Sequence, residues 1–193
     1  MRLWIATLSA GLLGATMAFA QDDGLQIDGG DDSLMATPQA LPEGSEVGNN
    51  TSFGDWLVNC EAVTTTRVAC SLLQELSLAE TDQLIVRFIV VPAEDDAAII
   101  LAQVPIGAYL PGGAVFRLDN EDEDVPQRSM IWQRCLGPLC EAALRLDAEE
   151  LARFAENDQM LFGYRPALEA DPIVVGVDIA QFNDALEAIR GGN

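Results

Sequence analysis

The sequence contains no histidine, and each of its ten basic residues is arginine rather than lysine. Without histidine, a Ser-His-Asp or Cys-His site has no base. Without lysine, the chain can form neither a Schiff base nor the nucleotide-phosphate loop whose lysine contacts the phosphates. No Rossmann glycine fingerprint is present either. We therefore expect no catalytic and no cofactor-binding residues, and an enzyme is disfavoured because only carboxylates, tyrosine and arginine remain for chemistry.

Positive charge is scarce, with ten basic residues against 31 acidic ones and a net charge of −21. Such a surface repels nucleic acid and anionic lipid headgroups, so we expect no nucleic-acid partner. It attracts a basic partner or a cation. Adaptation to a salty environment explains the same composition equally well.

The N-terminal segment has the three parts of a secretory signal. Arg2 supplies the positive charge, and the apolar stretch over residues 3–13 is too short to span a membrane. Ala18 and Ala20 provide the small residues of a cleavage site. We therefore predict a signal peptide over residues 1–20, a periplasmic or secreted mature protein, and no integral membrane segment after cleavage.

The four cysteines are expected to form a disulfide framework, the default for an even number of cysteines in an oxidising compartment. Of the three possible connectivities, Cys60–Cys70 with Cys135–Cys140 is the most economical. No metal site is expected, because the first pair is spaced too widely for zinc and no histidine is available. The "CLGPLC" stretch has four intervening residues where a redox pair usually has two. Its Gly-Pro favours a tight turn closed by a structural disulfide.

Residues 21–50 carry seven acids and no base, with glycine, proline, serine and asparagine between them. They show no apolar periodicity, so they cannot bury enough surface to offset the entropy lost on ordering. We predict an acidic disordered leader that folding does not require. A role as spacer or recognition tail is the alternative.

Residues 51–193 are predicted to form a single all-β domain, a β-sandwich of about nine short strands with two short covering helices. Short apolar runs rich in β-branched and aromatic residues alternate with turn residues at regular spacing, as in sandwiches and barrels. The expected strands are 53–60, 67–75, 83–91, 97–104, 113–118, 128–135, 139–146, 159–165 and 173–179.

Two segments have helical patterns. "DAEELARFAEN" begins with Asp147, an N-cap candidate, and has Glu150 three residues later, as in a capping box. "AQFNDALEAIRGG" places four apolar residues on one stripe and ends in Gly-Gly, a usual helix stop. Both helices are expected to cover the sandwich with their apolar faces.

Two acidic clusters are candidates for cation binding. The residues 119–124, "DNEDED", offer the oxygen ligands that Ca²⁺ prefers. They lack the glycine and the terminal glutamate spacing of an EF-hand, so a solvated hairpin tip is favoured. The cluster within residues 93–98 is interpreted as another strand connection.

Five further residues have a functional interpretation beside a structural one. Glu75 and Glu80 lie near a strand end without a matched acid and base partner. Trp56 and Trp132 each lie a few residues before a cysteine, where a large aromatic side chain is more often part of the core than a ligand-stacking surface. Arg134 is expected to pair with a neighbouring acid.

The order of several motifs resembles the invasion-associated locus B family over about residues 52–190. The motifs are "FGDWLVNC" with Trp56, "CSLLQ" with Gln74, "VPIGAYLPGG", the second cysteine pair and "QFNDALEAI". The resemblance implies a small exported β-sandwich protein without established catalytic residues. Its name implies a role in host-cell invasion, although a general envelope role is the safer expectation.

Two functions from different classes follow. The first is an exported, non-catalytic binding protein whose partner is an unknown protein or envelope component. The second is a carboxylate-based periplasmic enzyme acting on a glycan, which requires two carboxyl groups across a cleft. A cleft with two such acids would support the enzyme, and a filled sandwich would support the binding protein.

Overall fold

The computed structural model describes residues 47–65, 67–119, 125 and 127–190. The chain divides into two units, residues 1–38 and 39–193. The first unit, with the predicted signal peptide and most of the predicted leader, lies outside the described residues. The described residues all belong to the second unit.

The described residues form ten strands, and every paired neighbour is antiparallel. The strand order in the sheet is β1-β2-β3-β4-β5-β8-β7-β6-β9-β10. The strands are β1 (Ser52–Phe53), β2 (Trp56–Ala62), β3 (Val68–Ser77), β4 (Leu84–Pro92), β5 (Ala98–Pro105), β6 (Ala114–Leu118), β7 (Arg128–Leu136), β8 (Leu139–Leu146), β9 (Gln159–Tyr164) and β10 (Ile173–Asp178).

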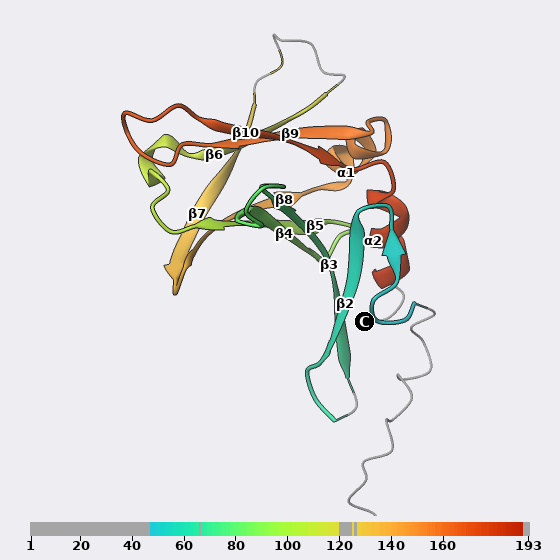
Figure 1. The fold of residues 1–193 in the computed structure, drawn as a ribbon. Coiled ribbons are helices and arrows are strands. Elements are labelled where there is room, and N and C mark those ends of the chain that lie inside the picture. Colours follow the sequence, from blue (N-terminus) through green and yellow to red (C-terminus); the bar gives the residue numbers. More distant parts are fainter. Residues whose placement is uncertain (1–46, 66, 120–124, 126, 191–193) are drawn as a thin grey trace, which may run out of the picture. The chain divides into compact units, whose positions relative to one another are not determined.

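Strand β7 joins two halves of this sheet. Its first residues, 128–130, pair with β6, whereas residues 131–136 pair with β8. The half that contains β1 to β5 and β8 therefore continues through β7 into the half that contains β6, β9 and β10. Figure 1 shows the second half lying across the first, with β7 running between them. The all-β prediction is confirmed, and the two layers are parts of one folded-over sheet.

The two halves pack face to face through side chains that alternate along the strands. In β5, Ala98, Ile100, Ala102 and Val104 are buried, and the residues between them are partly exposed. This two-residue period is the pattern of a strand with one face in the core. The fold therefore follows from the alternation already present in the sequence.

Three contacts connect the layers directly. Phe88 of β4 and Phe162 of β9 meet edge to face, with ring centroids 5.1 Å apart. The hydroxyl of Tyr164 donates to the carbonyl of Ile85 at 3.3 Å. The indole N–H of Trp56 on β2 donates to the carbonyl oxygen at position 178 on β10, at 3.1 Å.

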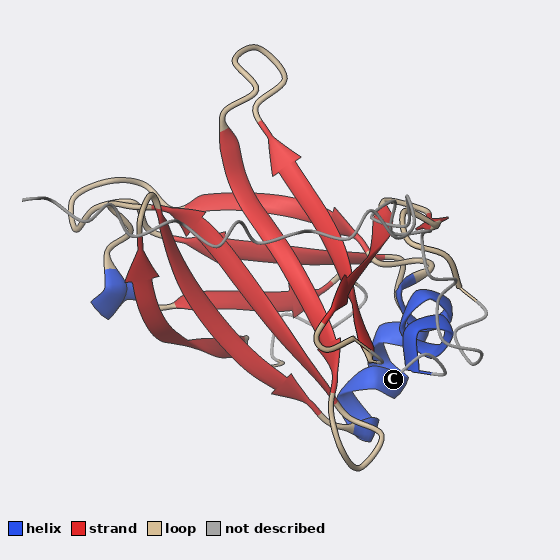
Figure 2. Cartoon of the chain, turned by 90° about the horizontal axis from the view of Figure 1, so that it is seen from below, coloured by secondary structure: helices blue, strands red, loops and turns tan. Residues whose placement is uncertain are grey.

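Helices α1 (Ala148–Ala155) and α2 (Phe182–Arg190) close one end between the halves (Figure 2). The carboxylate of Asp147 accepts from the N–H of Glu150 at 2.9 Å, so the predicted N-cap is confirmed. The apolar stripe predicted for the second helix is buried in α2, and its residues are Phe182, Ala185, Leu186 and Ile189. An aromatic series joins the helices to the strands, with Trp56–Phe182 at 5.2 Å and Phe154–Phe182 at 4.9 Å.

The cysteines form the disulfides Cys60–Cys70 and Cys135–Cys140, and none is free. Each bond joins residues that lie directly opposite in an antiparallel pair, β2 with β3 and β7 with β8. The Cα separations are 4.0 Å and 3.9 Å. Gly137 has a φ of 57°, so the chain reverses as predicted.

Two local features differ from the predictions. The expected strand at 53–60 is interrupted at Gly54, whose φ is 57°, and this turn creates the short extra strand β1. A 3₁₀ helix, η1 (Leu110–Gly112), precedes β6. Among the described residues, no helix is long and apolar enough to cross a membrane.

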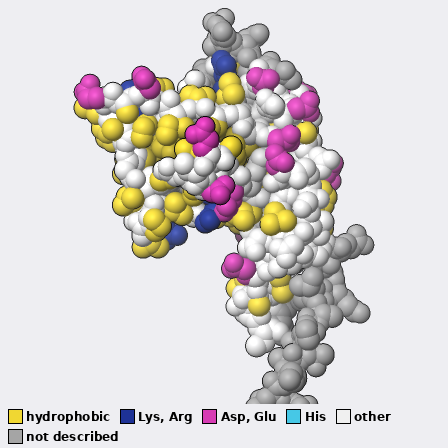
Figure 3. Space-filling view, viewed as in Figure 1, with side chains coloured by type: hydrophobic (Ala, Val, Ile, Leu, Met, Phe, Trp, Pro, Cys, Tyr) yellow, Lys and Arg dark blue, Asp and Glu magenta, His cyan; other side chains and the backbone are white. Residues whose placement is uncertain are grey.

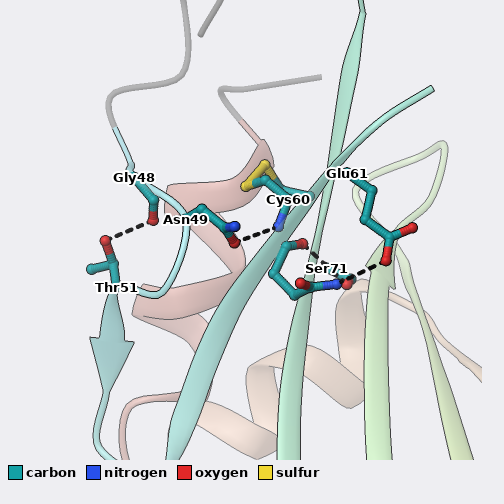
Figure 4. The surroundings of a disulfide bond; sticks show 8 residues. Gly48, Asn49, Thr51, Cys60, Glu61 and Ser71 are labelled. Carbon is teal, nitrogen blue, oxygen red and sulfur yellow. Dashed lines mark hydrogen bonds between the residues drawn. A yellow bond between two sulfur atoms is a disulfide. The ribbon is translucent and has the colours of Figure 1, made fainter. Parts of the chain in front are cut away.

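The last residues of the predicted leader contact the domain. The side-chain oxygen of Asn49 accepts from the N–H of Cys60 at 2.9 Å, and the N–H of Asn50 donates to Val58 at 2.8 Å. Figure 4 shows Asn49 beside the disulfide at the edge of β2. The structured part therefore begins at least as early as residue 47.

These contacts predict where the N-terminus can be shortened. A chain that begins at residue 47 should melt within a few degrees of one that begins at residue 21. A chain that begins at residue 51 loses both hydrogen bonds to β2 and should lose about 1–2 kcal/mol of unfolding free energy. Thermal melts of the three chains test this. Equal stability of the two shorter chains would show that the contacts contribute nothing.

The disulfides should each stabilise the fold by restricting the unfolded chain. Replacing both cysteines of one pair with alanine should lower the unfolding free energy by about 2–3 kcal/mol, with the 135–140 pair costing about 0.5 kcal/mol less because its loop is shorter. Urea denaturation of the two double variants measures this. Reduction of the parent protein is the control and should produce both losses together. A double variant as stable as its parent contradicts the prediction.

Tyr164 gives the fold an alkaline pH dependence. Burial raises the pKa of its hydroxyl above the ordinary value of 10.0, so the folded state holds this proton more tightly than the unfolded state. The stability it contributes is complete below the unfolded pKa and is lost as pH rises through the folded pKa. Because the chain has no lysine, few other groups titrate there.

Urea denaturation between pH 9 and pH 11.5 should show this loss in the parent protein. Tyr164→Phe should flatten the profile, while costing about 1 kcal/mol at neutral pH because the carbonyl of Ile85 loses its donor. The matched control, Tyr109→Phe, should keep the decline. A decline that persists in Tyr164→Phe would rule out this group.

Candidate functional site

A pocket of about 350 Å³ lies at the end of the unit opposite α1 and α2. Three connections form it: residues 78–83 between β3 and β4, residues 106–113 between β5 and β6, and residues 165–172 between β9 and β10. We call this end the loop end. The apolar lining residues are Leu78, Leu84, Ile85, Pro105, Ile106, Ala108, Tyr164, Pro166 and Ile173.

Backbone hydrogen bonds hold the pocket walls in place. The N–H of Ile106 donates to Pro138 in the β7–β8 turn at 2.8 Å, and the N–H of Tyr109 donates to Arg165 at 2.8 Å. The guanidinium of Arg165 donates to Ala170 at 2.8 Å, which holds its own connection together. Gly107 has a φ of 109°, a conformation that suits glycine, between the two anchored positions. The walls are therefore formed before any ligand arrives.

Tyr164 forms the inner wall. Its hydroxyl is held by the carbonyl of Ile85, and burial raises the pKa of this hydroxyl, so the phenol is neutral at physiological pH. The other lining side chains offer mostly carbon to the pocket. Such a site binds apolar groups by removing their surface from water.

Exposed apolar side chains continue the pocket onto the surface. Five of them lie on the three connections or at the end of β7 and are between 41% and 71% exposed: Leu78, Ile106, Leu110, Leu136 and Leu168. Figure 3 shows hydrophobic side chains gathered at this end, on the left of the view. Grouped exposed apolar residues mark interaction sites more often than scattered ones do.

The acidic candidates do not form a catalytic site in the described residues. Of the cluster at 119–124, only Asp119 is described. No group of three or more potential ligands in the described part of the chain could hold a metal. Asp95 and Asp96 make the tight β4–β5 turn, with φ values of 60° and 55°, so that cluster is a strand connection as expected. Glu75 forms an ion pair with Arg87, and Glu80 is exposed in the β3–β4 connection.

The other candidates are structural. Trp56 is fully buried against α2. Trp132 packs at the edge of the core, and its indole N–H has no acceptor among the described residues. Arg134 lies 3.5 Å from Glu141, as expected for a pair opposite in the ladder. The side chain of Gln74 is buried in the core.

Sequence reasoning missed the pocket. One signal was available: "VPIGAYLPGG" and its neighbours place large apolar residues in connections, where polar residues are usual. Two further pockets, of about 500 Å³ and 190 Å³, lie beside Cys70 and Val174 respectively. None of the three is lined by two carboxylates.

Comparisons with known proteins identify the family and support the fold. A family model described as Invasion associated locus B (IalB) protein matches residues 56–190. A crystal structure of invasion-associated protein B from Bartonella henselae has a TM-score of 0.62 and 16% identity, covering 72% of this chain and 93% of that chain. No curated protein sequence gives a significant match. Because the family model covers most of the folded unit, the chain belongs to the invasion-associated locus B family.

Proposed function

We propose that the chain is an exported, non-catalytic binding protein that holds a protein or envelope partner at its loop end. The observation that carries this proposal is the apolar pocket and its surrounding exposed side chains, Leu78, Ile106, Leu110, Leu136 and Leu168. A filled core behind the pocket and walls held by backbone hydrogen bonds support binding rather than chemistry.

Export is supported by the disulfides. Each bond links two neighbouring strands of the sheet, and such bonds persist in oxidising compartments such as the periplasm. The predicted signal peptide over residues 1–20 also supports export. An envelope role is the function that these features favour, and the name of the Bartonella protein adds invasion as a role of that relative.

A glycan-cleaving enzyme is supported less well. Its mechanism requires two carboxyl groups about 5–10 Å apart across a cleft. The candidate pocket has no carboxylate in its lining, and the pocket beside Cys70 has one, that of Glu94. The apolar lining favours contact with carbon surface over recognition of sugar hydroxyls.

Site-specific photocrosslinking in intact cells tests the proposal. A photoreactive phenylalanine analogue at Ile106, which is 64% exposed at the loop end, should yield a discrete crosslinked species. The matched control is Val63, which is 50% exposed in the β2–β3 connection at the opposite end and should yield none. No product at Ile106, or the same product at both positions, would contradict a loop-end binding site.

A further inference from the structure

We propose that the loop-end pocket receives an apolar side chain from a basic segment of another protein. This inference rests on the proposed function and names the chemistry of the partner. The pocket volume of about 350 Å³ is at the lower end of the range of about 300–1,000 Å³ for small-molecule sites. It therefore suits one or two aliphatic or aromatic side chains rather than a large ligand.

Four exposed carboxylates lie in two of the three connections that form the pocket, and we call them the acidic rim: Glu80, Asp82, Glu169 and Asp171. The first two lie in the connection that supplies Leu78, and the other two lie in the connection that supplies Pro166. All four residues are exposed, and none forms an ion pair within the described part of the chain.

Arg165 lies in one of these two connections, and Arg87 lies in β4, which follows the other. Arg87 pairs with Glu75, and the guanidinium of Arg165 donates to the carbonyls of Leu168 and Ala170. Donation to neutral carbonyls leaves the positive charge of Arg165 intact, but the four rim carboxylates outnumber it, so the net charge of the two connections beside the apolar pocket is negative. A segment with arginine or lysine on either side of an apolar anchor matches this arrangement in both respects.

Charge also argues against two other occupants. Residues 21–46 of the same chain contain apolar residues, but they carry seven acids and no base, so the rim repels them. A second copy brings a net charge of −21 to a surface of the same sign. A basic segment of a different protein is the occupant that the electrostatics favour.

A fluorescein-labelled peptide of alternating arginine and leucine tests the proposal by fluorescence anisotropy, with the chain from residue 21. It should bind at least tenfold more tightly than a peptide with glutamate in place of arginine. It should also bind at least tenfold more tightly than one with serine in place of leucine. Binding should weaken as salt rises, because exposed charges are screened. Equal binding of the three peptides would overturn the proposal.

Two kinds of variant locate the binding. Ala108→Trp fills the pocket and should weaken binding about tenfold. If this variant does not fold, Ile106→Ser removes apolar surface from the pocket wall and should also weaken binding. Replacing the four rim carboxylates with amides (Glu80→Gln, Asp82→Asn, Glu169→Gln and Asp171→Asn) should weaken binding about tenfold and reduce its salt dependence. The control neutralises Glu61, Glu94, Glu156 and Glu187, which are exposed elsewhere, with the same change in net charge. It should lose less than twofold.

Three results would overturn the inference. The first is a loss of affinity in the control variant as large as that in the rim variant, which would show attraction by net charge alone. The second is an unchanged affinity in the pocket variants Ala108→Trp and Ile106→Ser. The third is much tighter peptide binding by a chain from residue 47 than by the chain from residue 21, which would show that residues 21–46 occupy the pocket. Crosslinking at Ile106 in cells with no peptide preference would leave the proposed function standing and remove only the basic partner.

Discussion

The sharing of strand β7 between the two halves of the sheet is the constraint on which the rest of the structure depends. Its start pairs with β6 and its remainder with β8, and the register shifts after Trp132. Such shifts bend a strand and increase its twist. The bend brings one half over the other, so that Phe88 meets Phe162 and the phenol of Tyr164 reaches Ile85. Without it, these apolar faces would lie in one exposed layer.

Folding a sheet over leaves two open ends, and the chain closes them differently. At one end, α1 and α2 insert Phe154 and Phe182 between the halves, which completes the core with large rings. At the other end only connections are available. They meet through backbone hydrogen bonds, such as that from Tyr109 to Arg165, and leave the apolar pocket between them. The candidate site is thus at the end of the core that neither α1 nor α2 covers.

The sequence predicted most of the fold because most elements follow from local patterns. β5 was expected at 97–104 and lies at Ala98–Pro105, since its apolar residues alternate; the N-cap at Asp147 is also local. The apolar connections were visible in the sequence, but their joining into one pocket was not, because Leu78, Ile106 and Pro166 meet from three distant connections. Alternation says which face of a strand is buried, but not which connections meet beyond the strand ends.

Two connections share one feature, an arginine side chain that donates to their backbone carbonyls. Several arginines act as internal clamps on backbone carbonyls: Arg145 donates to Glu94, Arg165 to Ala170, and Arg190 to Asp96. A guanidinium suits this work because its planar fork presents several donors in fixed directions, which an ammonium does not. Positive charge is thereby used to hold turns, while most carboxylates face solvent. The described surface is therefore predominantly negative because acidic residues outnumber basic ones and most of them are exposed.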